Sequence, residues 1–137
     1  MSYAGDVTPE QAWTVLRDEP GAVLVDVRTR AEWSYVGLPD LADLGKEVVL
    51  VEWQTYPDGA VNGRFVAELE AAGVPKEAPV YFLCRSGVRS VAAAEAATRG
   101  GWVRSHNVVE GFEGPHDEQR HRSVSGWKVA GLPWVQG

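Results

Sequence analysis

The segment that is most informative about fold and function is Val80-Tyr81-Phe82-Leu83-Cys84-Arg85-Ser86-Gly87-Val88-Arg89-Ser90. The first four residues are apolar with no polar residue between them, which is typical of a strand buried on both faces of a parallel sheet. From Ser90 to Thr98 the chain is rich in alanine and predicts a helix, which Gly100 and Gly101 end. Cys84, the only cysteine of the chain, therefore lies in a short loop between a buried strand and a helix.

Three other apolar runs predict further strands, at residues 22–27, 48–51 and about 103–109. Strands that alternate with helices imply an α/β fold, with three layers and a central, mostly parallel sheet flanked by helices on both faces. We expect one such domain over residues 1–137, since this length suits a single core. The residues after 112 are expected to be irregular up to the tail at 126–134.

Two capping boxes, Thr8 with Gln11 and Thr29 with Glu32, predict helices that begin at residues 9 and 30. The first is expected to reach residue 16 or 17 and the second about residue 35. Asn62 is expected to cap a third helix over about residues 64–72, which ends at a glycine.

Composition excludes several classes of protein. A net charge of −6 argues against a nucleic-acid partner, which would require a basic stripe. No apolar run approaches the roughly 20 residues that span a membrane, so no membrane partner is expected. The first residues show neither the basic region nor the apolar run of a signal peptide. One cysteine allows no internal disulfide, which fits a reducing compartment, and we expect a cytoplasmic protein.

The loop after Cys84 has the features of a nucleophile's environment. A tight turn at Gly87 can direct successive backbone N–H groups at one point, and the start of a helix adds partial positive charge there. These features favour the thiolate of Cys84, while Arg85 and Arg89 would attract an anionic substrate. A lone cysteine on an apolar strand is more often a small buried hydrophobic residue, but the glycine turn, arginines and helix start favour chemistry.

The segment Cys84-Arg85-Ser86-Gly87-Val88-Arg89-Ser90 resembles the active-site loop of the rhodanese family. Asp26-Val27-Arg28 with Glu32-Trp33 resembles the early strand and turn of that family, and residues 126–133 resemble its closing segment. Together these motifs cover most of the chain in the order and spacing of one rhodanese domain.

The resemblance implies a sulfurtransferase that works without a cofactor or a metal. Cys84 would take the outer sulfur of a small anionic donor such as thiosulfate and hold it as a persulfide. The residues expected to bind the persulfide are Arg85, Ser86, Gly87, Val88, Arg89 and Ser90. Because no second cysteine is present, the sulfur would pass to an external acceptor: cyanide, a thiol or a protein.

Two alternatives stay open. One is a catalytically idle rhodanese-like module that binds or regulates a partner. The other is a cysteine-dependent phosphatase or arsenate reductase, in which a Cys-x5-Arg loop cradles three oxygens. Here the spacing from Cys84 to Arg89 is one residue shorter, which suits sulfur better. The family's Gly-His-Ile-Pro-Gly-Ala segment is replaced by Val36-Gly37-Leu38-Pro39-Asp40-Leu41, and the unusual residues 42–52 that follow are expected to alter the pocket wall.

Three supporting residues, Asp26, Arg28 and Gly111, are expected beside the cysteine loop, because the carboxyl ends of parallel strands share one edge. Asp26 would fix the loop by accepting hydrogen bonds and Arg28 would lie next to it, or the two would form a local salt bridge that orders the turn. Gly111 would allow a close backbone approach. Glu32 is interpreted as a capping residue only.

The remaining candidates are weaker. Trp53 and Tyr56 are packing residues or line the pocket mouth. His106, His116 and His121, with Asp117 and Glu118, lack the spacing of a zinc site, so no metal is expected. A lid formed by Arg120, His121 and Arg122 is a further hypothesis.

Overall fold

Five parallel strands form the central sheet, and this confirms the α/β fold that the sequence predicts. The computed structural model describes residues 3–55, 59–85, 87–114 and 126–135. The strands, in their order across the sheet, are β1 (Gly5–Val7), β6 (Ser105–Val108), β5 (Val80–Leu83), β2 (Val23–Asp26) and β4 (Val49–Leu50).

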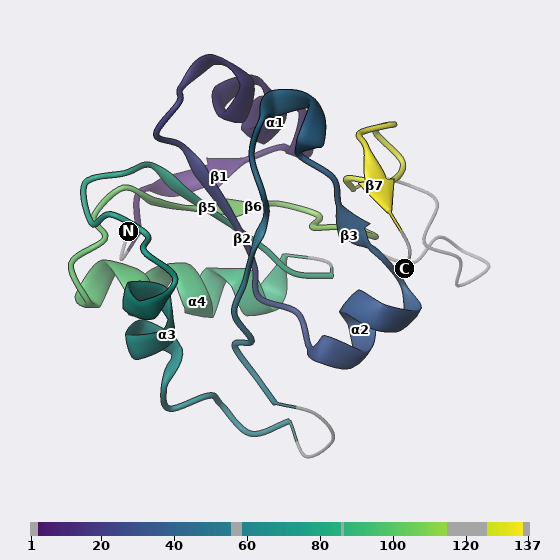
Figure 1. Cartoon of the computed structure of the whole chain (residues 1–137). Helices are drawn as coiled ribbons and strands as arrows, with labels where there is room; N and C mark the ends of the chain where they lie inside the picture. Colours follow the sequence, from purple (N-terminus) through teal and green to yellow (C-terminus); the bar gives the residue numbers. More distant parts are fainter. Residues whose placement is uncertain (1–2, 56–58, 86, 115–125, 136–137) are drawn as a thin grey trace.

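Helices cover both faces of this sheet. The helix α1 (Pro9–Asp18) lies on one face, and α3 (Phe65–Ala71) and α4 (Val88–Arg99) lie on the other (Figure 1). Alternate residues of β5 face opposite layers: Phe82 packs in the cluster that contains α3 and α4, whereas Leu83 packs in the cluster that contains α1. A strand covered on both sides needs apolar residues at every position, which explains its unbroken apolar run.

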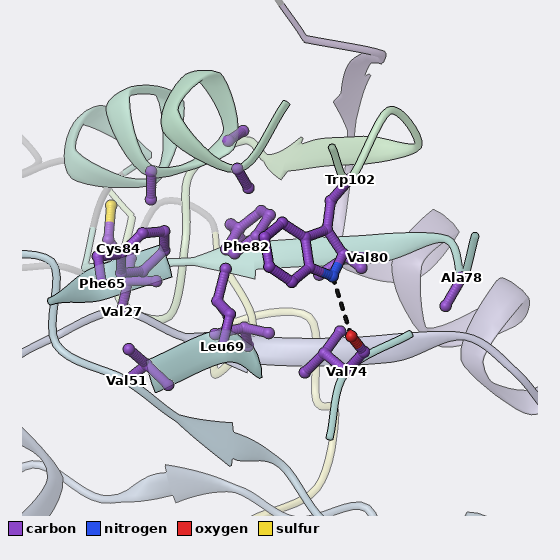
Figure 2. Packing of buried hydrophobic residues seen from close by; sticks show 14 residues of the cluster. Val27, Val51, Phe65, Leu69, Val74, Ala78, Val80, Phe82, Cys84 and Trp102 are labelled. Atoms are coloured by element: carbon purple, nitrogen blue, oxygen red, sulfur yellow. Dashed lines mark hydrogen bonds between the residues drawn. The ribbon is translucent and has the colours of Figure 1, made fainter. Parts of the chain in front are cut away.

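The larger of the two hydrophobic cores includes Cys84. Trp102 is fully buried in its centre and donates a hydrogen bond from its indole nitrogen to the Val74 carbonyl at 3.0 Å (Figure 2). Phe65, Phe82 and Cys84 belong to the same cluster, and Cys84 is 1% exposed. The sulfur atom is therefore backed by close-packed apolar side chains.

Both predicted capping boxes are present. Thr8 caps α1, and Thr29 caps α2 (Arg30–Tyr35), in each case with reciprocal side-chain and backbone hydrogen bonds. The cap predicted at Asn62 is wrong, because α3 begins after Arg64 and no side chain caps it. Asn62 Oδ1 accepts the Arg64 N–H at 3.0 Å, one residue before the helix, and Asn62 Nδ2 donates to the Glu52 carbonyl at 2.9 Å in the preceding loop.

Three short strands were not predicted. β1 lies at the sheet edge beside β6, and β3 (Leu38–Pro39) pairs antiparallel with β7 (Trp134–Val135) in a second, two-stranded sheet. A short 3₁₀ helix spans Ala42–Leu44, in the stretch that sequence alone left without a structure. None of the helices in the described ranges is long and apolar enough to cross a membrane.

Candidate active site

Cys84 lies directly after β5, at the carboxyl edge of the sheet, and its sulfur faces the start of α4. The backbone N–H of Gly87 donates to Cys84 Sγ at 3.1 Å, and Ser90 Oγ lies 3.3 Å from the same sulfur. Gly87 has a φ of 101°, a left-handed conformation that favours glycine and that turns the chain back towards the sulfur. Ser86 lies outside the described residues.

The helix α4 begins at Val88, two residues earlier than predicted, so its first turn forms part of the loop itself. The first N–H groups of a helix have no partner within the helix, and they carry its positive end. Because the first turn contains Ser90, which contacts the sulfur, this positive end lies beside Cys84. Val88 is 76% exposed at the outer side of the turn.

The turn after β6 is hydrogen-bonded to the backbone of the cysteine loop. Phe112 N–H donates to the Cys84 carbonyl at 2.8 Å, and Glu113 N–H donates to the Arg85 carbonyl at 2.9 Å. A Cβ atom on Gly111 would overlap the Cys84 carbonyl oxygen and lie 2.7 Å from the Arg85 carbonyl carbon. The close backbone approach predicted at Gly111 is therefore present, and a side chain has no room there.

Asp26 and Arg28 form a fully buried ion pair at the end of β2, which is the local salt bridge considered from the sequence. Arg28 Nη2 lies 2.7 Å from Asp26 Oδ2 and donates to the Gly37 carbonyl at 2.6 Å. The guanidinium carbon also lies 4.2 Å from the ring centre of Phe112. Arg28 thus joins the end of β2 to the turn that holds the cysteine loop.

Glu32 does more than cap α2. Its carboxylate forms a bidentate ion pair with Arg89, at 2.7 Å and 2.9 Å, and also accepts from the Thr29 backbone N–H at 3.1 Å. Burial by itself would raise the pKa of Glu32, but the hydrogen bonds from Arg89 and Thr29 outweigh it and lower the pKa to about 2. The hydrogen bond to Glu32 and the charge of Glu32 raise the pKa of Arg89.

This pair changes the role expected for Arg89. The sequence predicted that Arg85 and Arg89 both attract an anion. In the structure the half-buried side chain of Arg89 binds Glu32 instead. Arg85, in contrast, is exposed beside the cysteine. Sequence reasoning missed the ion pair because 57 residues separate its members, and it also missed Asn107, whose amide accepts from Ser90.

Two of the weaker candidates make packing contacts. Trp53 packs edge-on against Phe65 at 5.1 Å in the core, and His106 stacks on Tyr81 at 4.8 Å. Tyr56, His116, Asp117, Glu118, Arg120, His121 and Arg122 lie outside the described residues, so the lid stays a hypothesis. Within the part of the chain that the structure describes, no group of three or more His, Cys, Asp or Glu side chains could hold a metal.

Comparison with known proteins gives the family. The model of the STR4 middle domain matches residues 4–137. An uncharacterised protein of Rickettsia conorii, RC0915, is 36% identical over 94% of this chain and 95% of its own length. The chloroplastic rhodanese-like domain-containing protein 4 of Arabidopsis thaliana is 27% identical over 96% of this chain, which matches 26% of that protein.

Solved structures agree with the fold. Rv0390 of M. tuberculosis is 57% identical, with a TM-score of 0.92 over 98% of this chain and 99% of that chain. The polysulfide-sulfur transferase homodimer of Wolinella succinogenes is similar with a TM-score of 0.67, over 99% of this chain and 80% of that one. At 20% identity, the latter likeness shows the fold alone.

The contact at Gly111 predicts a selective loss of stability. Gly111 and Gly131 both have positive φ, 57° and 77°, but a Cβ on Gly131 would meet nothing within 4 Å. Replacing either by alanine should cost about 1 kcal/mol of backbone strain. Gly111→Ala should lower the free energy of unfolding by about 2 kcal/mol more, because its Cβ overlaps the cysteine loop. Urea denaturation measures both losses, and equal losses would contradict the close approach.

The ion pair of Glu32 predicts a pH dependence. The folded pKa of about 2 lies below the ordinary value of 4.5, so the pair stabilises the fold above about pH 4.5 and this contribution is lost as pH falls towards 2. The contribution is on the order of 3 kcal/mol. Unfolding measured across this range should show wild type and Glu32→Gln converging in acid. Glu47→Gln, at an exposed carboxylate, is the control and should run parallel to wild type; no convergence for Glu32→Gln would refute the assignment.

Proposed function

The chain belongs to the rhodanese-like family, and we propose that it is a sulfurtransferase that carries sulfane sulfur as a persulfide on Cys84. One observation supports this most strongly. Cys84 Sγ accepts the Gly87 N–H at 3.1 Å and lies beside the positive end of α4, where an anionic sulfur would be stabilised.

The first step loads the sulfur. The Cys84 thiolate attacks the outer sulfur of thiosulfate, a new S–S bond forms, and the bond to the sulfonyl sulfur breaks. Its electron pair leaves with sulfite, and one negative charge stays on the outer sulfur of the persulfide. The donor is a small anion, and the exposed Arg85 beside the loop would attract it.

The loop then holds the charged outer sulfur. The turn at Gly87 and the first turn of α4 supply N–H groups fixed by the backbone, so no reorganisation is needed when the charge appears. Cys84 packs against the core and is 1% exposed, and such a low-polarity wall strengthens these interactions.

The second step returns the thiolate. An acceptor attacks the outer sulfur, the S–S bond to Cys84 breaks, and the electron pair returns to Cys84 Sγ; with cyanide the product is thiocyanate. The chain has no second cysteine to take the sulfur, so the acceptor is external: cyanide, a thiol or a protein thiol. Neither step needs a resident cofactor or metal. We place the protein in a reducing compartment such as the cytoplasm, without a nucleic-acid or membrane partner.

The ion pair of Arg89 argues against phosphatase or arsenate reductase chemistry. Those enzymes clamp the oxygens of a bound anion with a free bidentate guanidinium. Here both terminal nitrogens of Arg89 already bind Glu32, and the loop is one residue shorter. An idle binding module is disfavoured because the cysteine, its N–H donor and the helix start are all in place.

Intact-protein mass spectrometry after incubation with thiosulfate tests the proposal. Wild type should gain the mass of one sulfur atom and lose it on addition of cyanide, whereas the matched variant Cys84→Ser should gain nothing. Mercaptopyruvate serves as a second donor. If wild type takes up sulfur from neither donor, the sulfurtransferase proposal fails and the binding module takes its place. Sulfur uptake by Cys84→Ser would place the carrier at another residue.

A further inference from the structure

A chain of hydrogen bonds leads from the Cys84 sulfur to the edge of the sheet. Ser90 Oγ lies 3.3 Å from Cys84 Sγ, and the Ser90 hydroxyl donates to Asn107 Oδ1. Asn107 Nδ2 donates to Asp6 Oδ1 at 3.1 Å, and the Tyr3 hydroxyl donates to the same oxygen at 2.8 Å. This series of hydrogen bonds crosses from α4 to β6 to β1 and joins residues up to 101 positions apart.

The direction of this chain is fixed at its outer end. A carboxylate can only accept hydrogen bonds, so the amide nitrogen of Asn107 must face Asp6. The amide oxygen of Asn107 therefore faces Ser90. A hydroxyl has a single hydrogen, and Ser90 gives it to Asn107. Ser90 consequently turns a lone pair towards Cys84, where it can accept a hydrogen bond but cannot donate one.

We propose that Asp6 and Asn107 are positioning residues that hold the Ser90 hydroxyl as an acceptor for Cys84, and so favour the neutral thiol and the sulfur-loaded state over the free thiolate. This inference rests on the proposed function only for its second half, the sulfur-loaded state. The effect on the thiol holds for any chemistry at Cys84.

Cys84 can be a thiol, a thiolate or a persulfide, and these three states differ in the hydrogen bond that they can form with Ser90. The thiol donates S–H to Ser90 Oγ and satisfies the chain. The thiolate needs a donor, but if Ser90 turned its hydrogen to the sulfur, the oxygens of Ser90 and Asn107 would face each other with no hydrogen between them. In the persulfide, Sγ has no hydrogen to donate, but it is neutral because the charge lies on the outer sulfur, so it repels the Ser90 oxygen less than the thiolate does. The unloaded sulfur is thereby protected from oxidation, since the thiolate is the form of cysteine that oxidants attack.

Charged residues lie on the cysteine loop and on the elements next to it. They are Arg85 in the loop, Arg89 on α4, Glu32 on α2, Asp26 and Arg28 at the end of β2, and Glu110 after β6. The arginines and the Gly87 N–H favour the thiolate, and the carboxylates oppose it. Four of these groups form two ion pairs, so their effects on the sulfur largely offset each other. Substitutions at Asn107 leave all of them unchanged.

The test is a double-mutant cycle on the ionisation of Cys84. Asn107→Leu is similar in size, keeps the charge of Asp6 and removes the acceptor of the Ser90 hydroxyl. Ser90→Ala removes the hydroxyl itself. Thiolate formation is followed by ultraviolet absorbance against pH in wild type, both single variants and the double variant. Subtracting the spectrum of Cys84→Ser removes the signal of the tyrosines, because the chain has one cysteine.

Asn107→Leu should lower the pH at which half of Cys84 is ionised by about one pH unit, since the freed Ser90 hydroxyl then donates to the thiolate. In the Ser90→Ala background the same substitution should have no effect. The proposal is overturned if Asn107→Leu leaves the midpoint unchanged or raises it. It is equally overturned if the shift is the same with and without the Ser90 hydroxyl, as a merely structural role would give.

Asp6→Asn gives a second route if Asn107→Leu does not fold. Asp6 is exposed, and asparagine has the same shape, but its amide can donate, so Asn107 is free to turn over and donate to Ser90. The pH at which half of Cys84 is ionised should fall again, and most of this fall should vanish in the Ser90→Ala background. A fall of the same size in that background would report only the lost charge of Asp6 and would overturn the proposal. This titration needs no sulfur transfer, so failure to load sulfur from thiosulfate would refute the proposed function alone.

Discussion

The site depends on the way the carbonyl groups of Cys84 and Arg85 are bound. Both carbonyls accept hydrogen bonds from the backbone of the turn after β6, at 2.8 Å and 2.9 Å. A peptide unit is planar, with its N–H opposite its C=O. Binding of the Cys84 carbonyl therefore also fixes the Arg85 N–H, on the opposite side of the same peptide unit, and further along the loop the Gly87 N–H donates to Sγ. Gly111 makes this contact possible because a side chain there would collide with the loop.

Two ion pairs order the surroundings of this loop. Asp26 and Arg28 are fully buried, and such a pair gains little net stability over apolar residues but becomes costly to break. Arg28 also contacts Gly37 and Phe112, so it fixes the relative positions of three segments. Glu32 and Arg89 join α2 to the first turn of α4. The charges near the sulfur are thus mostly paired, and the backbone N–H groups are left as the donors that face an anionic sulfur.

The sequence predicted the features that local patterns determine. The apolar runs at residues 22–27, which only Asp26 interrupts, and 80–83 predicted β2 and β5. The capping boxes at Thr8 and Thr29 predicted the starts of α1 and α2. The position of Cys84 at the carboxyl edge followed from the parallel sheet. In contrast, β1, β3 and β7 have two or three residues each and form only through pairing with distant segments, which leaves no local pattern. The bond from Arg89 to Glu32 and the chain from Ser90 to Asp6 were missed for the same reason.

A crystal structure of the protein after loading with thiosulfate tests the central claim, that backbone N–H groups rather than a guanidinium hold the charged sulfur. We expect one additional sulfur atom bonded to Cys84 Sγ, within hydrogen-bond distance of the N–H groups between Gly87 and Ser90. Arg89 should remain bound to Glu32 in that structure. An outer sulfur turned away from these N–H groups, or held by an Arg89 side chain released from Glu32, would contradict it.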